Sequence, residues 1–128
     1  MVVADTSAVL TLLLEDPPVP ALATRLSGVR LHAPHLVDVE FLHALRRLVA
    51  TARIPAARAA SVRADFARLT IVRYSHGLLL DRMWGLRDNL SAYDAAFVAL
   101  SEALEIPLVT TDARLAAAPG NHAVIEAF

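Results

Sequence analysis

Val2-Val3-Ala4-Asp5-Thr6-Ser7 and, much later in the chain, Leu108-Val109-Thr110-Thr111-Asp112 share one pattern. In each, a short apolar run ends at hydroxyl side chains and an aspartate. Short unbroken apolar runs are typical of strands buried in a parallel sheet. Asp5 and Asp112 would then project from the carboxyl ends of strands, which is where open α/β sheets bind ligands. The two stretches therefore predict both a fold class and the place of a site.

Helical and strand patterns alternate along the rest of the chain. We expect strands at residues 2–5, 29–33, 71–74, 108–110 and 124–125. Helices are expected at residues 6–15, 21–26, 36–52, 56–69, 77–87 and 91–105. Such alternation predicts an α/β fold, a three-layer α/β/α arrangement around a central, mainly parallel sheet. A length of 128 residues suits one domain, so we expect a single domain over residues 1–128.

The composition is apolar, with 56% hydrophobic residues and a mean hydropathy of +0.50. The longest nearly unbroken apolar stretch, residues 8–14, is far shorter than the roughly 20 residues of a membrane span. An apolar surface too large to bury predicts an oligomer or a docked partner, although an alanine-rich core is the simpler alternative. No basic segment precedes the first apolar run, so we expect no secretory signal and a cytoplasmic location.

The charge balance excludes several classes of protein. A net charge of −1 argues against binding nucleic acid through overall positive charge, so any such contact must be local. All 12 basic residues are arginine, which suits phosphate binding but is equally well explained by a composition bias. The chain has neither the lysine of a Walker A loop or phospho-receiver domain nor the cysteine of a disulfide or thiolate site.

Two further carboxylates fall on predicted helices. Glu40 lies one position from the apolar stripe of the helix at 36–52, and Asp94 lies near the start of the helix at 91–105. With Asp5 and Asp112 they make a quartet that would repel itself unless a cation offset the charge. Magnesium prefers such oxygen ligands and can activate water for phosphodiester hydrolysis. Asp38 is two residues from Glu40, faces another direction and is expected to be solvated.

Each acid also has a purely structural interpretation. Asp5 could mark only the end of a strand, with Thr6 or Ser7 capping the helix that follows. Ser91 and Asp94 have the spacing of a capping box, in which both side chains satisfy backbone donors.

The other two acids are equally ambiguous when taken singly. Asp112 could cap a short helix, and Glu40 could be a surface acid paired with His43 or Arg47. His32 and His35 lack a third ligand, so we expect no zinc site.

Taken together, the motifs resemble the PIN-domain nucleases, and more closely the VapC toxins of bacterial toxin–antitoxin pairs. The resemblance covers nearly the whole chain. The matching segments are Val3-Ala4-Asp5-Thr6-Ser7-Ala8, Ala33-Pro34 followed by Glu40, Leu90-Ser91-Ala92-Tyr93-Asp94-Ala95, and Pro107-Leu108-Val109-Thr110-Thr111-Asp112-Ala113-Arg114-Leu115.

That resemblance implies a magnesium- or manganese-dependent endoribonuclease that acts as a toxin. It also implies an RNA substrate, a homodimer and a VapB-like antitoxin partner. It assigns Asp5, Glu40, Asp94 and Asp112 to the acidic site, with Asp5 and Asp94 holding the first metal.

Two positions refine the resemblance. Thr110 matches a commonly polar position beside the metal pocket of the family. Three residues after Glu40, the family often has asparagine, whereas this chain has His43. The surroundings of Glu40 therefore depart from the family pattern.

Two other functions stay open from the sequence. One is a catalytically idle PIN-like binding module, and the other is a housekeeping PIN ribonuclease in RNA processing. The phosphate-contact candidates are Arg46, Arg47 and Arg114, although each could be an ordinary solvated charge on a helix.

Overall fold

A sheet of five parallel strands, in the order β3-β2-β1-β4-β5, lies at the centre of the protein. The structure is a computed structural model that describes residues 1–128. Its elements, in chain order, are β1 (Val2–Ala4), α1 (Thr6–Leu14), α2 (Pro20–Leu26), β2 (Leu31–Pro34), α3 (Leu36–Ala50), α4 (Ala56–Arg68), β3 (Ile71–Tyr74), the 3-10 helix η1 (Gly77–Leu79), α5 (Leu80–Gly85), α6 (Ala92–Leu104), β4 (Leu108–Thr110), α7 (Ala113–Ala117) and β5 (Ile125–Ala127). The predicted α/β fold is confirmed.

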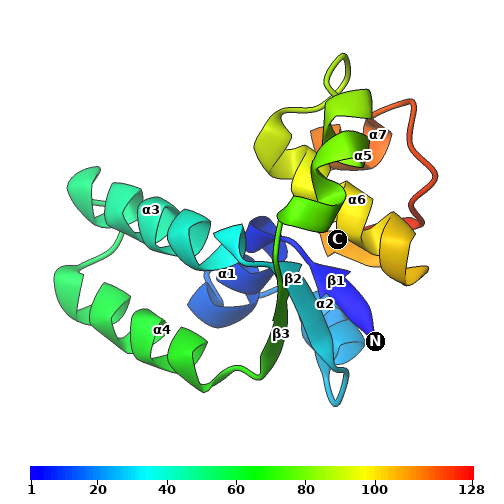
Figure 1. Cartoon of the computed structure of the whole chain (residues 1–128). Helices are drawn as coiled ribbons and strands as arrows, with labels where there is room; N and C mark the ends of the chain where they lie inside the picture. Colours follow the sequence, from blue (N-terminus) through cyan, green and yellow to red (C-terminus); the bar gives the residue numbers. More distant parts are fainter.

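The order in which successive strands are added to the sheet reverses beside β1. From β1 the chain moves outward through β2 to β3, and then crosses back beyond β1 to β4 and β5. Because parallel crossovers are right-handed, this reversal puts α1 to α4 on one face and α5 to α7 on the other. Figure 1 shows α3 and α4 on one side of the sheet and α5, α6 and α7 gathered on the opposite side. The carboxyl ends of β1 and β4 thus form the switch point at which such sheets bind ligands.

Helix α6 is the most deeply buried helix. Seven consecutive residues, from Ala95 to Ser101, are all buried. Its alanines have side chains small enough to let the helix lie close to β1 and β2, which it contacts. This packing fixes the start of α6, where Asp94 lies, relative to the end of β1.

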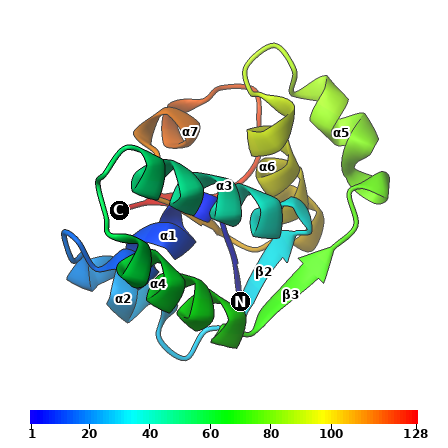
Figure 2. The same ribbon diagram turned by 90° about the vertical axis from the view of Figure 1, so that its left-hand side faces the viewer.

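Helices α3 and α4 form an antiparallel pair that is held by aromatic stacking. Phe41 and Phe66 lie with their rings 4.0 Å apart and only 8° from parallel, and both are buried. Figure 2 shows the two helices side by side. The contact anchors the middle of α3 next to Glu40.

Several predicted boundaries were wrong in detail. The expected helix at 77–87 is a 3-10 turn followed by the short α5, the second strand starts at Leu31 and includes Pro34, and the last strand is Ile125–Ala127. Pro34 fits in a strand because its carbonyl can still accept even though it has no N–H to donate. No helix has the length and apolar character needed to cross a bilayer.

Candidate active site

All four predicted carboxylates line one pocket of about 330 Å³, which we call the central pocket. Residues of α1, α3 and α6 form its walls, together with the turn that follows β4. It lies at the switch point of the sheet, beside the carboxyl ends of β1 and β4. The acids of the quartet are Asp5, Glu40, Asp94 and Asp112.

Asp5 is the most buried and the most tightly held of the four. Its Oδ1 accepts hydrogen bonds from Ser7 Oγ at 2.7 Å and from the Ala8 N–H at 2.8 Å. Its Oδ2 accepts from Thr110 Oγ1, across the gap between β1 and β4. Burial raises the pKa of Asp5, the hydrogen bonds from Thr110, Ser7 and Ala8 lower it, and the charge of Asp94 raises it, for a net rise.

The prediction that Thr6 or Ser7 caps α1 was wrong. Asp5 itself is the N-cap, because its side chain accepts from the Ala8 N–H. The two hydroxyl residues serve the site instead: Thr6 donates to Glu40, and Ser7 donates to Asp5 and accepts from the Thr111 N–H. The clue in the sequence was the pair of hydroxyl residues directly after a strand-ending aspartate.

Glu40 reaches into the pocket from α3 and is half-buried. Its Oε1 accepts a hydrogen bond from Thr6 Oγ1 at 2.8 Å, so its partner is Thr6, neither His43 nor Arg47. Burial raises the pKa of Glu40, and the charges of Asp94 and Asp5 raise it further against the bond from Thr6. Glu40 is therefore part of an acidic cluster, and His43 lines the same pocket.

Asp94 is the acid with the fewest partners. Ser91 caps α6 by accepting from the Asp94 N–H at 3.2 Å, but the Asp94 carboxylate makes no return bond, so only half of the capping box forms. Burial raises the pKa of Asp94, as does the charge of Asp112, against lowering by Ser91 and Arg114. Asp94 also raises the pKa values of Asp5 and Glu40, so it lies at the electrostatic centre of the cluster.

Asp112 lines the pocket and also caps a helix. It is the N-cap of α7 and accepts from the Arg114 N–H at 2.9 Å, with the Arg114 guanidinium 3.4 Å away. Burial raises the pKa of Asp112, but the hydrogen bonds and charge of Arg114 outweigh it and hold that pKa below its ordinary value. Asp112 is the one member of the quartet that has its own cation.

Comparison with known proteins identifies the family. Residues 2–121 match the PIN domain family. Ribonuclease VapC9 of Mycobacterium tuberculosis is 46% identical over 115 residues, which are 90% of this chain and 88% of the relative. The chain belongs to the VapC family of PIN-domain ribonucleases. Ribonuclease VapC12 of the same organism is 38% identical over 126 residues, 98% of either chain.

Solved structures show the same VapC fold at lower identity. The crystal structure of PAE2754 from Pyrobaculum aerophilum has a TM-score of 0.70 at 21% identity, covering 97% of this chain and 81% of that one. Mycobacterium tuberculosis VapC20, a sarcin–ricin loop cleaving toxin, has a TM-score of 0.62 at 18% identity, covering 91% of this chain and 94% of its own. These likenesses confirm the PIN-like architecture.

The donor set of this VapC pocket fits a hard cation. Three carboxylates have raised pKa values, partly because their charges repel, and a divalent cation would relieve that repulsion. As they lie in the structure, no three His, Cys, Asp or Glu side chains form a group that could enclose an ion. Magnesium commonly uses only one or two carboxylates and keeps several waters, so a complete protein cage is not required.

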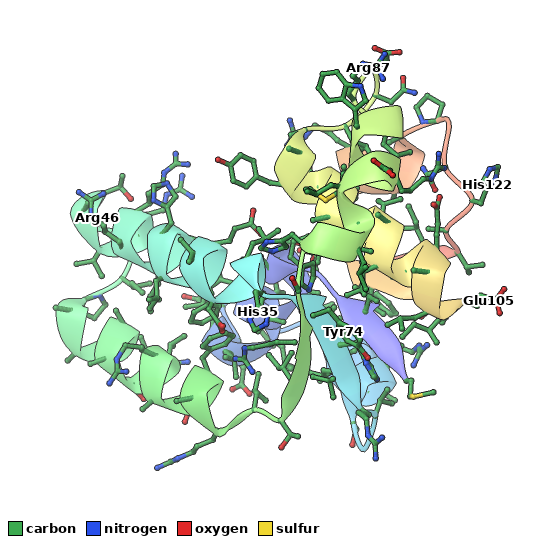
Figure 3. The ribbon with its side chains drawn as sticks, in the orientation of Figure 1. His35, Arg46, Tyr74, Arg87, Glu105 and His122 are labelled. Carbon is green, nitrogen blue, oxygen red and sulfur yellow. The ribbon has the colours of Figure 1, made fainter.

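Three further residues that the sequence analysis singled out lie outside the central pocket. Asp38 lies outside the central pocket with 40% of its side chain exposed, in keeping with the predicted solvation. Its carboxylate also accepts from Arg73 Nε and Nη2 at distances of 2.7 to 3.0 Å, which the sequence did not predict and which ties α3 to the edge strand β3. His32 is buried with its Nδ1 2.7 Å from Tyr74 Oη. His35 lies at the exposed start of α3, as Figure 3 shows.

Proposed function

We propose that this VapC-family protein is the toxin of a toxin–antitoxin pair and an endoribonuclease that depends on magnesium or manganese. The quartet of Asp5, Glu40, Asp94 and Asp112 would hold the metal and hydrolyse RNA phosphodiester bonds. The observation that carries the proposal is that one pocket gathers four carboxylates at the switch point and raises three of their pKa values. Such perturbed, clustered groups are typical of functional sites.

The four carboxylates would divide the work according to their surroundings. A bound divalent ion would supply Lewis acidity, lower the pKa of water and offset the charge of the scissile phosphate. Asp5 is fixed by three donors and would provide a rigid ligand, whereas Asp94 has no competing hydrogen bond and is free to bind. Glu40, positioned by Thr6, can hold or orient a water beside them.

Asp112 would have a different part. Because Arg114 keeps its pKa low, Asp112 stays ionised under conditions in which the other three take up protons. Asp112 would complete the site electrostatically, because its negative charge raises the pKa of Asp94. Its backbone N–H also donates to Thr110, so the turn after β4 supports the bond from Thr110 to Asp5.

We further propose a homodimer, a VapB-like antitoxin and a cytoplasmic location. Large hydrophobic side chains are exposed on two regions of the chain, and such surfaces commonly mark interfaces. On α3 these are Val39 and Leu42; on η1 and α5 they are Leu78, Leu80 and Trp84. The mass of the purified protein in solution tests the dimer, and co-purification with the product of a neighbouring reading frame tests the antitoxin.

The decisive experiment compares RNA cleavage by antitoxin-free wild type and Asp94→Asn, with magnesium, with manganese and with chelator. Cleavage should require the metal and fall sharply in the variant. Asp81→Asn is the matched control, because Asp81 is an exposed acid in the first turn of α5, outside the central pocket. Its activity should equal that of wild type.

The same experiment separates the competing functions. An idle binding module would bind no metal through Asp5 and Asp94 and would cleave nothing, with folded protein shown by circular dichroism. A housekeeping ribonuclease would cleave RNA, but its expression without an antitoxin would leave cell growth unaffected. Arrested growth that disappears with Asp94→Asn would support the toxin.

A further inference from the structure

We infer that the central pocket is the middle of a longer groove that binds a single RNA strand through arginines on both sides of the acids. This inference rests on the proposed ribonuclease function. It names the residues that would contact the phosphates flanking the scissile bond. They are Arg47 and Arg53 on one side and Arg114 on the other.

Three pockets adjoin one another at this face of the molecule. A pocket of about 580 Å³, the Arg47 pocket, is formed by Leu10, Ala44, Arg47, Leu48, Thr51 and Arg53. It shares Leu10, Ala44 and Arg47 with the central pocket. A pocket of about 310 Å³, the Arg114 pocket, includes Asn89, Ser91 and Arg114 and shares Asp94 with the central pocket. The shared residues place the central pocket, with its acids, between the other two pockets.

The charges along this groove change sign twice. The Arg47 pocket contains two arginines and no acid. The Arg114 pocket contains one arginine and, as its only acid, the shared Asp94. A metal at the acids would take the scissile phosphate, and guanidinium groups suit the phosphates on either side. This order of groups suits a nucleic-acid backbone, which carries phosphates on both sides of the scissile one.

The arginines of the groove are exposed, and none is held by a close carboxylate. Arg47 and Arg53 are exposed and form no ion pair within the chain. Arg114 is 91% exposed at its side chain and has only a 3.4 Å contact with Asp112. By contrast, Arg25, Arg73 and Arg82 are each committed to a close carboxylate.

The structure also separates Arg46 from Arg47, two neighbours that the sequence analysis offered together as phosphate-contact candidates. Arg46 and Arg47 are neighbours on α3, but Arg47 lines both the Arg47 pocket and the central pocket, whereas Arg46 lines neither. Figure 3 shows Arg46 on the part of α3 that lies away from the sheet. The pair is therefore a matched test, since both substitutions remove one exposed charge from the same helix.

The polar groups beside the arginines favour RNA over an antitoxin segment. Thr51, Asn89 and Ser91 add hydroxyl and amide groups that can bond to phosphate and sugar oxygens. An acidic peptide could meet the arginines but would be repelled by the four carboxylates between them. RNA brings a phosphate to the metal at that point.

The test measures binding of RNA separately from its cleavage. All variants are made in an Asp94→Asn background, so that RNA is not consumed, and a labelled single strand of mixed sequence and about ten nucleotides is followed by fluorescence anisotropy in magnesium. Arg47→Ala, Arg53→Ala and Arg114→Ala should each weaken binding about three- to tenfold. Each should also make the dependence on salt shallower by about 0.7 in the log–log slope.

Arg46→Ala and Arg63→Ala are the controls, because both remove an exposed arginine that lies outside the three pockets. They should change binding less than about twofold. Equal losses in controls and groove variants would overturn the groove, since net charge alone would then explain binding. Unchanged binding in all three groove variants would overturn it too.

Cleavage is then measured on the same variants without Asp94→Asn. This measurement distinguishes a failure of the groove from a failure of the proposed ribonuclease function. Binding that depends on the groove arginines, without cleavage by wild type, would refute the ribonuclease and leave the groove standing. Cleavage with an unchanged KM in Arg47→Ala and Arg114→Ala would refute the groove and leave the ribonuclease standing. Loss of antitoxin binding with unaltered RNA binding would assign these arginines to the antitoxin and overturn the groove.

Discussion

Thr110 donates a hydrogen bond from Oγ1 to Oδ2 of Asp5 at 2.5 Å, and so joins the carboxyl ends of β4 and β1 across 105 residues of sequence. Both residues are buried, and the bond satisfies one of the two carboxylate oxygens of Asp5. The strand pairing that places Ala4 opposite Val109 puts the two side chains within reach. The site is thus part of the sheet itself.

Thr110→Val should lower the free energy of unfolding by about 1–3 kcal/mol, because it leaves an oxygen of Asp5 buried without its donor at nearly constant volume. Urea denaturation measures the change. Thr110→Ser keeps the hydroxyl and should lose less than Thr110→Val. Equal losses for the two variants would mean that packing, and not the hydrogen bond, accounts for the role of Thr110.

Asp94→Asn should raise the melting temperature at pH 7 in chelator by a few degrees. The folded state raises the pKa of Asp94, so it binds the proton more tightly than the unfolded chain, and the ionised carboxylate opposes folding. This penalty outweighs the favourable position of an acid at a helix start. The gain should shrink as the pH falls from 7 toward 4, because the carboxyl of the folded protein takes up its proton at a higher pH than that of the unfolded chain, whose pKa is the ordinary 3.8.

Calorimetric scans at the two pH values test this difference. Asp81→Asn should show no comparable gain at pH 7. A lower melting temperature for Asp94→Asn than for wild type at pH 7 would show that Asp94 stabilises the fold, contrary to a strained functional acid.

Manganese affinity should fall as the pH is lowered from 7 to 5. Metal ligands must be deprotonated, and the raised pKa values of Asp5, Glu40 and Asp94 bring their protonation above the usual carboxyl range of about 4. Titration calorimetry at several pH values measures the effect. Asp112→Asn should weaken binding but keep its pH dependence, because Asp112 has a lowered pKa. A flat affinity across this range would contradict the prediction.

Asp38→Asn should affect stability and Glu40→Gln should affect cleavage, although the two residues are only two positions apart. Asp38→Asn weakens a partly exposed ion pair with Arg73 and should cost up to about 1 kcal/mol of stability while keeping cleavage. Glu40→Gln should reduce cleavage about 10- to 100-fold. Denaturation and cleavage are measured on both variants. An equal loss of cleavage in both variants would mean that disturbing α3 is enough to reduce activity, and that the Glu40 carboxylate has no specific role.

Local patterns allowed most of the fold to be predicted. The strands at residues 71–74 and 108–110 were predicted with their observed bounds. A short apolar run between turns or polar residues can be recognised without knowing which distant residues it will contact. The helix at Ala92–Leu104 was predicted from its cap at Ser91 for the same reason. The split into η1 and α5 was missed, since tertiary contacts decide where a short helical stretch breaks.

The sequence by itself indicated that Asp5 and Asp112 follow buried strands and that the chain folds as α/β, because apolar runs and the alternation of elements are local patterns. That the two strands lie side by side is decided by the order of the sheet. Only the tertiary structure decided that Thr6 donates a hydrogen bond to Glu40 and that Asp38 forms an ion pair with Arg73. These partners lie 34 and 35 residues apart, and a hydrogen bond of that range depends on how helices pack against the sheet. Helical spacing puts Arg47 on the same face of α3 as Glu40, and only packing decided that this face lines the central pocket.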